Sequence, residues 1–182
     1  MAFDVKVNID LSKPVGSVGF GIPLILVENA SAAIAYTEVA SMAEVVTAGF
    51  AATTDAYKAV QLMFAQQAPK SVAVCAVTGG APAALADDIL VGKGWRQLIV
   101  LNDGDETAST VTAISTAVEA LDGKLYFAGL ETDDSTSITV SGLRRTILFY
   151  CDKTDSVPVP VAALVGESCG RAAGSFTYKN MT

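Results

Sequence analysis

Hydrophobic residues occupy every second position near the start of the chain. Between residues 3 and 9 the apolar side chains are Phe3, Val5, Val7 and Ile9, and charged or amide side chains separate them. A period of two is typical of a β-strand with one buried face and one wet face. At residues 22–27 the apolar run is continuous, which predicts a strand buried on both faces, as in a parallel sheet.

Further along the chain, apolar runs alternate with helical periods. The runs predict strands at 71–77, 97–101, 124–130 and 146–151. Apolar residues three and four positions apart predict helices at 41–48 and 82–91, a helix that Thr53 or Thr54 caps and that ends before Pro69, and a helix that Asp105 caps and that extends to 121. Another helix is predicted to begin near Pro158 or Pro160. Residues 30–37 show no clear period.

Strands that alternate with helices are typical of an α/β fold with a mainly parallel sheet and helices packed on its faces. We predict that fold, together with an N-terminal strand or arm. The chain then divides into residues 1–20, which hold this strand and a glycine turn, and residues 21–182, which form one α/β domain.

Three glycines, Gly16, Gly19 and Gly21, lie just before the continuous run at 22–27. A dinucleotide-binding turn requires G-x-G-x-x-G at the start of a helix, because the helix N-terminus holds the phosphates. Here the order is G-x-x-G-x-G, and a strand follows. The glycines therefore predict a flexible turn between two strands, and they are candidate hinge residues.

The charge balance narrows the function classes. The 182 residues carry a net charge of −7 and include no histidine. Nucleic acid and anionic membrane surfaces attract basic proteins, so we expect neither as a partner. No apolar run approaches the roughly 20 residues of a membrane-spanning helix. With 51% hydrophobic residues, the chain is expected to fold around a sizeable core.

The three cysteines, Cys75, Cys151 and Cys169, show no C-x-x-C spacing. Because histidine is also missing, the sequence offers no metal-site pattern. We expect reduced thiols that fill small apolar spaces, and we expect no metal and no cofactor.

One motif invites an enzymatic interpretation. Residues 166–170 match G-x-S-x-G, the turn that exposes the nucleophile Ser168 in serine hydrolases. A Ser-His-Asp triad is excluded because the chain has no histidine, and a serine-lysine pair with Lys153 or Lys179 has nothing to position it. A small-residue helix face explains the motif better.

Two other segments allow a ligand-binding interpretation. The acidic segment 102–106 lacks the spacing of a calcium loop, and a turn followed by a helix cap accounts for it. Gly79 and Gly80 follow a predicted strand, as in phosphate-binding turns, but no G-K-[ST] follows them. The expectation is therefore that the protein is not an enzyme.

Several stretches together resemble the contractile tail sheath proteins of bacteriophages and related phage-tail-like bacteriocins. They occur in the family's order along nearly the whole chain. The stretches are 4–9, Gly19–Leu26 (GFGIPLIL), Ala56–Gln67 (AYKAVQLMFAQQ), Pro69–Val74 (PKSVAV), Arg145–Tyr150 (RTILFY), Ala162–Gly166 (AALVG) and Gly174–Met181 (GSFTYKNM).

This resemblance implies a structural role in a virion tail or phage-tail-like particle that is assembled in the bacterial cytoplasm. Such subunits form a helical homopolymer around an inner tail tube protein, contact baseplate and tail terminator proteins, and store contraction energy in subunit contacts. Their terminal arms add strands to a neighbour's sheet. Phe3, Val5, Val7 and Ile9 would then form an inter-subunit strand. Family members are usually longer, so the resemblance implies that their C-terminal domain is absent from this truncated or short form.

Two other function classes stay open at the level of sequence. One is a small α/β enzyme, either serine hydrolase-like or nucleotide-binding, because of Ser168 and the glycine turns. The other is an interaction module of some other assembly.

Overall fold

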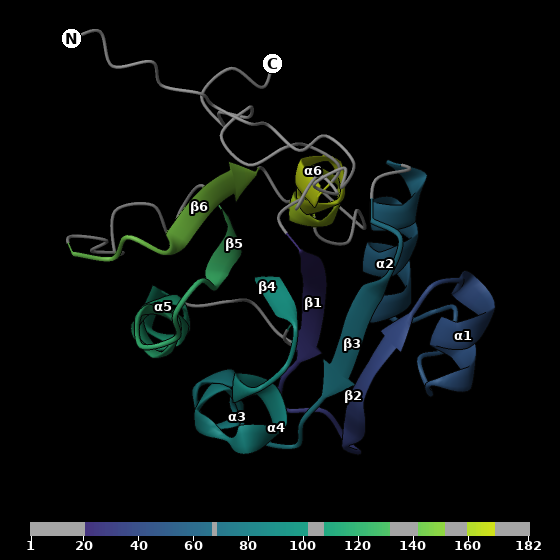
Figure 1. Cartoon of the computed structure of the whole chain (residues 1–182), viewed down its shortest axis with the longest axis horizontal. Coiled ribbons are helices and arrows are strands. Elements are labelled where there is room, and N and C mark those ends of the chain that lie inside the picture. Colours follow the sequence, from purple (N-terminus) through teal and green to yellow (C-terminus); the bar gives the residue numbers. More distant parts are fainter. Residues whose placement is uncertain (1–20, 67–68, 102–107, 132–141, 152–159, 170–182) are drawn as a thin grey trace, which may run out of the picture.

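A six-stranded sheet forms the centre of the computed structural model, which describes residues 21–66, 69–101, 108–131, 142–151 and 160–169. The strand order is β2-β3-β1-β4-β5-β6, and β2 alone runs antiparallel to its neighbour. The strands are β1 (Ile22–Val27), β2 (Ile34–Val39), β3 (Val72–Ala76), β4 (Trp95–Leu101), β5 (Leu125–Glu131) and β6 (Thr146–Cys151). This mainly parallel sheet confirms the predicted α/β class (Figure 1).

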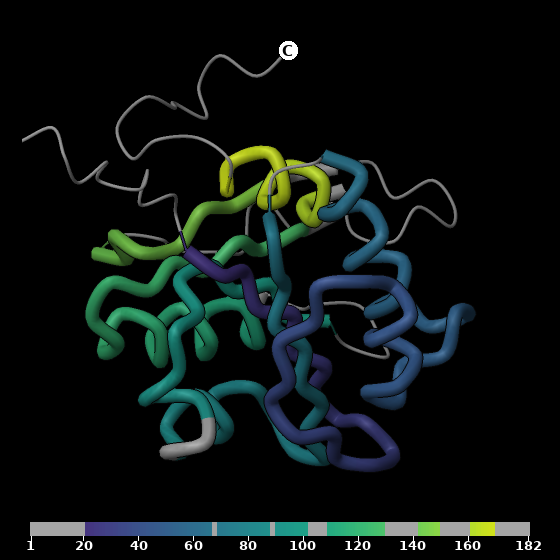
Figure 2. Tube along the Cα trace, turned by 45° about the vertical axis from the view of Figure 1, so that its right-hand side comes forward, coloured from purple at the N-terminus to yellow at the C-terminus, as the bar shows by residue number. Residues whose placement is uncertain are grey.

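Helices cover both faces of the sheet. The helices are α1 (Met42–Thr47), α2 (Asp55–Ala65), α3 (Ala81–Ala86), α4 (Asp88–Val91), α5 (Ala108–Glu119) and α6 (Pro160–Cys169). One apolar core lies between the sheet and α1, α2 and α6, and a second lies between the sheet and α3, α4 and α5. Helices α2 and α6 contact each other, and Figure 2 shows α6 (yellow) crossing beside one end of α2.

The central strand β1 belongs to both cores. Its side chains Leu24, Ile25 and Leu26 are fully buried, with Ile25 in the first core and the two leucines in the second. Each apolar side chain of this size contributes about 1.5–3 kcal/mol when it is buried. The continuous apolar run therefore folds as a strand covered on both faces, with the bounds that the sequence predicts.

Side-chain caps begin the helices α1 and α2 where the sequence suggests. The hydroxyl of Ser41 accepts a hydrogen bond from the Glu44 backbone N–H, and the hydroxyl of Thr54 accepts one from Tyr57. Gly49 follows α1 with φ 111, a conformation that glycine adopts without strain. These caps confirm the predicted starts of both helices.

The predicted helix 82–91 is wrong in one respect, because Asp87 divides it into α3 and α4. Asp87 has extended backbone angles (φ −84, ψ 145). Leu85 and Leu90 are both buried in the second core. Five residues along one straight helix would turn these side chains about 140° apart, so the break lets both face the sheet.

The sequence pattern also misses β2, which begins within the segment 30–37 and ends at Val39. Along β2 the exposure alternates, with Ile34 and Tyr36 half-buried and Ala35 and Thr37 exposed. Alternation of small and half-buried residues at a sheet edge gives a weak signal.

Predictions that concern residues 1–20, including Gly16 and Gly19, and the cap by Asp105 lie outside the described residues.

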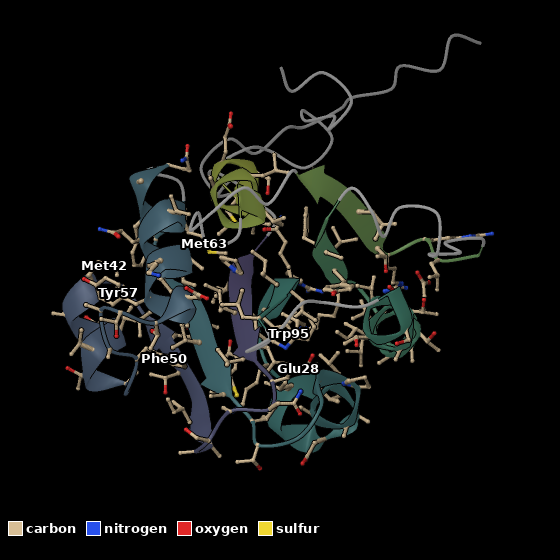
Figure 3. All side chains as sticks on the ribbon, turned by 180° about the vertical axis from the view of Figure 1, so that it is seen from behind. Glu28, Met42, Phe50, Tyr57, Met63 and Trp95 are labelled. Atoms are coloured by element: carbon tan, nitrogen blue, oxygen red, sulfur yellow. The ribbon has the colours of Figure 1, made fainter. Side chains whose placement is uncertain are left out.

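A glycine allows α6 to lie close to α2. A methyl group on Gly166 would lie 2.8 Å from both the Cα and the carbonyl oxygen of Met63, which Figure 3 shows on α2. Backbone atoms cannot yield as a flexible side chain can. Gly166 is therefore a packing residue at the contact between the two helices.

We predict that Gly166→Ala destabilises the protein. Alanine favours a helix over glycine by about 1 kcal/mol, but overpacking against a backbone costs about 1–3 kcal/mol. We expect a net loss of about 1 kcal/mol in the free energy of unfolding by urea denaturation. Gly92→Ala, with nothing within 4 Å of the added methyl, is the control. A Gly166→Ala protein more stable than the wild type would contradict the proposed contact.

Candidate functional site

The carboxyl ends of β1 and β4 mark the position where open α/β sheets bind ligands. The connection after β1 crosses one face of the sheet through α1 and α2, whereas the connection after β4 crosses the other face through α5. Ligands occupy the crevice at such a switch in direction. A hollow of about 430 Å³ opens there, and Glu28, Phe50, Thr54 and Leu101 are among its lining residues.

A protein carboxylate already occupies the anion position at this crevice. Glu28 is 2% exposed, and its Oε2 accepts a hydrogen bond of 2.6 Å from the backbone N–H of Ala81, in the first turn of α3. Gly80 provides no side-chain cap for α3. Glu28 thus takes the place that a phosphate would take after Gly79 and Gly80. The site does not favour nucleotide binding.

The motif residue Ser168 lies inside α6 and not on a strand-to-helix turn. Ser168 is fully buried, and its hydroxyl donates to the carbonyl of Val165 (2.9 Å). The same hydroxyl accepts a hydrogen bond from Nε2 of the buried Gln97 on β4 (3.0 Å). A serine engaged in this way cannot reach a substrate. The geometry therefore does not support Ser168 as a nucleophile.

Cys169 completes this buried polar cluster. Its thiol donates to Oε1 of Gln97 at 2.9 Å, so both ends of the Gln97 amide are bonded to α6. Burial raises the pKa of the Cys169 thiol from 9.0 to about 12. Burial likewise raises the pKa of the Cys75 thiol, and both cysteines are free. Each is a protonated thiol at neutral pH, and each donates a hydrogen bond, Cys169 to Gln97 and Cys75 to the Ile34 carbonyl, rather than only filling an apolar space as predicted.

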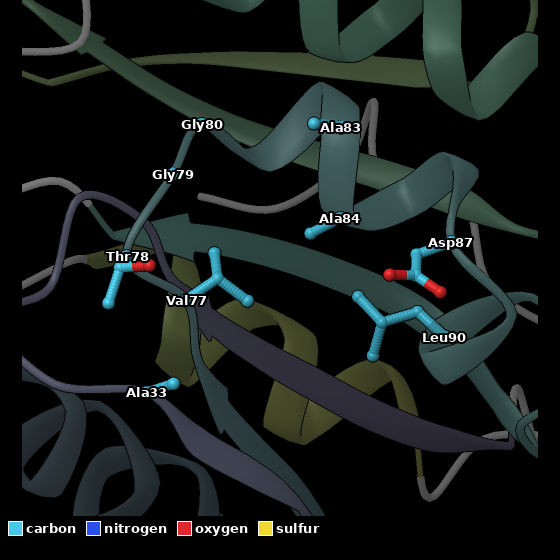
Figure 4. A pocket seen from close by; sticks show the side chains of 9 residues that line it. All are labelled: Ala33, Val77, Thr78, Gly79, Gly80, Ala83, Ala84, Asp87 and Leu90. Atoms are coloured by element: carbon cyan, nitrogen blue, oxygen red, sulfur yellow. The ribbon is translucent and has the colours of Figure 1, made fainter.

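A second hollow of about 250 Å³ lies beside α3 and α4. Figure 4 shows that it is lined mainly by small side chains, with Asp87 and Leu90 on one side and Thr78 on the other. Convergent polar groups, which a catalytic pocket needs, are few among its lining residues.

The described ranges contain no cluster of three or more histidine, cysteine, aspartate or glutamate side chains that could hold a metal ion. A search of the same ranges for a helix both long and apolar enough to cross a membrane also found none.

The two edges of the sheet differ in how they meet solvent. The outer strand β2 carries an irregular register between Ile34 and Thr37, an exposed charge at Glu38, and a hydroxyl of Thr37 that donates to the Ala35 carbonyl. Charges and irregularities of this kind discourage pairing with another strand. The β2 edge is therefore protected.

The opposite edge, β6, has none of these features within its described residues. Its sequence is TILFYC, and its register with β5 is continuous. Residues 146–149 are half-buried, with Ile147 and Phe149 against the first core and Leu148 against the second. An uncharged, regular and apolar edge strand is a ready template for strand addition.

Gly21, a candidate hinge residue, stands at the entrance to β1 with φ 81. A methyl group there would lie 2.3 Å from Cγ of Arg96, whose Nη1 donates to the Gly123 carbonyl at 3.3 Å. The direction in which the chain enters the sheet therefore depends on a residue without a side chain. The structure thus shows that position 21 requires glycine. A hinge motion at Gly21 stays a prediction.

The chain matches no profile of a known protein family, and no curated protein sequence matches it significantly. Among solved structures, it is similar to the helical sheath of the anti-feeding prophage (AFP) in the contracted state, determined by cryo-electron microscopy. The TM-score is 0.57, and the sequence identity is 19%. The match covers 96% of this chain and 52% of the sheath chain.

This chain has the tail-sheath fold. The match extends over almost all of its length, which confirms at the level of fold the resemblance that the ordered motifs indicate. The chain spans about half the length of the sheath protein that it matches.

Sequence reasoning missed the roles of Glu28 and Gln97, because a buried polar residue beside apolar runs does not reveal its partner across the sheet.

We predict that Glu28→Ala destabilises the tail-sheath fold by about 2–3 kcal/mol in urea denaturation, because it removes a charged hydrogen bond and leaves the Ala81 N–H unpaired. Glu28→Gln retains an acceptor and should lose less. Glu38→Gln, on the exposed β2 edge, should change stability by less than about 0.5 kcal/mol. Equal effects of Glu28→Ala and Glu38→Gln would show that Glu28 is not a helix cap.

We also predict a stability loss in alkali that depends on Cys169. Its folded-state pKa is raised, so its contribution is fully present below pH 9 and is lost as pH rises from 9 toward 12. Cys169→Ser keeps a hydroxyl donor beside Gln97 but does not titrate in this range. The stability advantage of the wild type over the variant should therefore shrink between pH 8 and 11, measured by urea denaturation. A constant difference would contradict the assigned pKa.

Proposed function

We propose that this chain is a structural subunit of a contractile, phage-type tail sheath. The observation that carries the proposal is the sheath fold, which matches over 96% of the chain. In this role the subunit polymerises with copies of itself around an inner tail tube and stores contraction energy in the contacts between subunits. Baseplate and tail terminator proteins are its further partners, in a particle assembled in the bacterial cytoplasm.

The use of polar groups supports a structural role. Glu28 and Ser168, which stand where a ligand or nucleophile would be sought, are both buried and bonded to other parts of the chain. Enzymes instead present convergent polar groups to a substrate. We therefore propose that the chain acts through assembly and not through catalysis.

The β6 edge supports a route by which copies join. We propose that the segment Phe3–Ile9 of one subunit adds a strand to the β6 edge of a neighbour. The alternating segment offers one apolar side, and β6 offers the half-buried Ile147 and Phe149 along the first core. Main-chain hydrogen bonds would provide affinity, and the apolar side would select the register.

The glycines that follow the segment Phe3–Ile9 fit the same role in strand exchange. Gly16, Gly19 and Gly21 connect the proposed exchanged strand to β1, and φ 81 at Gly21 shows that the last of them needs glycine. We propose that they form a hinge, so that a subunit can rotate during contraction while its strand stays paired with the neighbour.

We predict that the purified chain forms rings or hollow cylinders at high concentration in negative-stain electron microscopy. Val7→Asn, on the apolar side of the segment, should prevent this assembly, whereas Lys6→Asn, on its wet side, should permit it. A wild-type chain that stays monomeric at every concentration, and whose Ser168 reacts with a fluorophosphonate, would contradict the proposed function.

Hydrogen exchange offers a second measurement of the same assembly. Amides of residues 3–9 should exchange rapidly in the isolated monomer and slow down on assembly, because they gain strand partners only there. Strong protection of these amides in the monomer would contradict strand exchange between subunits.

A further inference from the structure

Strand β4 carries one extra residue opposite the start of β1. Ile22 pairs with Trp95, and the next residue of β1, Pro23, pairs with Gln97. Arg96, between the two, has no register partner on β1. Trp95 packs in the second core, whereas Gln97 bonds to α6 on the opposite face. Because residues two apart in a regular strand share one face, Arg96 is the extra residue of a β-bulge, a feature that redirects a side chain.

Buried contacts fix the backbone on which this bulge is built. The indole Nε1 of Trp95 donates to the Leu90 carbonyl at 2.8 Å. Lys124 is 7% exposed, and its Nζ donates to the carbonyls of Lys93 (2.7 Å) and Trp95 and lies over the Trp95 ring. Hydrogen bonds from a charged donor are stronger than those between neutral groups. The bulge is therefore held in place both from α4 and from the start of β5.

The Arg96 side chain lies across two glycines that both have positive φ. Gly21, at the entrance to β1, has φ 81, and a methyl group there would overlap Cγ of Arg96 and lie 2.9 Å from its Cβ. Gly123, in the α5–β5 loop (residues 120–124), has φ 66, and a methyl group there would overlap Nη1 of Arg96. The same Nη1 donates to the Gly123 carbonyl at 3.3 Å. Arg96 thus spans from the entrance of β1 to the α5–β5 loop.

The α5–β5 loop also binds the residue that precedes β6. Arg145 donates to the Leu121 carbonyl and to Oδ1 of Asp122 (3.0 Å), and its backbone N–H donates to the carboxylate of Glu119 at the end of α5. The entrance of β1 and the start of β6 are therefore both attached to one loop. The first is where the N-terminal segment joins the sheet, and the second begins the edge proposed to receive a strand.

We propose that Arg96 is a positioning residue for assembly, which fixes the direction in which the N-terminal segment leaves β1 relative to the β6 edge. This role rests on the proposed exchange of strands between subunits. In such a polymer each copy donates one strand and accepts another, so the angle between the two sites determines how successive copies are rotated. An arginine that contacts both Gly21 and the α5–β5 loop keeps this angle the same in every copy.

Paired substitutions in the full chain test the contact itself. Gly21→Ala and Gly123→Ala should each lower the urea midpoint of unfolding, because alanine at positive φ also meets Arg96. Each should lower the midpoint by less in an Arg96→Ala background, which lacks Cγ and the guanidinium group. Gly92→Ala, with nothing within 4 Å of the added methyl, is the control and should act equally in both backgrounds. Equal effects of the first two substitutions in both backgrounds would overturn the contact.

Sedimentation velocity of the full chain measures the positioning role. Arg96→Ala should weaken self-association about tenfold, because a segment without a fixed direction loses preorganisation. Its urea midpoint should change little, since Arg96 is exposed. Arg96→Lys keeps the stem over Gly21 and a donor for the Gly123 carbonyl, so it should retain most of the association. Lys58→Ala on α2 makes the same charge change as Arg96→Ala and should associate like the wild type.

Wild-type association by Arg96→Ala would overturn the positioning role, and so would an equal loss of association in Lys58→Ala. A lower urea midpoint with unchanged association would assign Arg96 a structural role only. If Arg96→Ala forms the same cylinders as the wild type in the electron microscope, the positioning role is wrong while the sheath function stands. A wild-type chain that is monomeric at every concentration, and forms no cylinders, contradicts both.

Discussion

Burial of β1 on both faces is the constraint on which the rest of the structure depends. A strand whose side chains Leu24, Ile25 and Leu26 are all fully buried needs helices above and below it. The chain meets this need by returning through α1 and α2 on one face and through α3, α4 and α5 on the other. The resulting order places the amino ends of the five parallel strands at one edge and brings Glu28, just after β1, to the start of α3.

Local sequence patterns predict the parts of the fold that local physics determines. The bounds of β1 follow from a continuous apolar run, and the starts of α1 and α2 follow from the caps Ser41 and Thr54. The break at Asp87 could not be predicted in this way, because it depends on how two leucines reach the same sheet. β2 was missed because its alternation of half-buried and exposed residues ends at Thr37, and Thr37 and Glu38 are both exposed.

The site shows the same division between local and distant causes. The sequence around Ser168 matches the motif of a nucleophile turn. In the structure, however, Gly166 packs against the backbone of Met63, and Ser168 accepts a hydrogen bond from Gln97 on β4. Both partners lie far away in the sequence, so spacing alone could not identify them. The missing histidine and the order of the motifs along the chain were better guides to function than this single motif. The sheath fold agrees with the order of the motifs.

The claim at the centre of this account is that copies of the chain assemble into a sheath through added strands. A helical reconstruction of the assembled chain by cryo-electron microscopy tests that claim most directly. The account predicts a hollow cylinder in which the sheet order β2-β3-β1-β4-β5-β6 is retained and a strand from a neighbouring subunit pairs with the β6 edge. Subunits related by a two-fold axis, or a compact oligomer without a central channel, would contradict it.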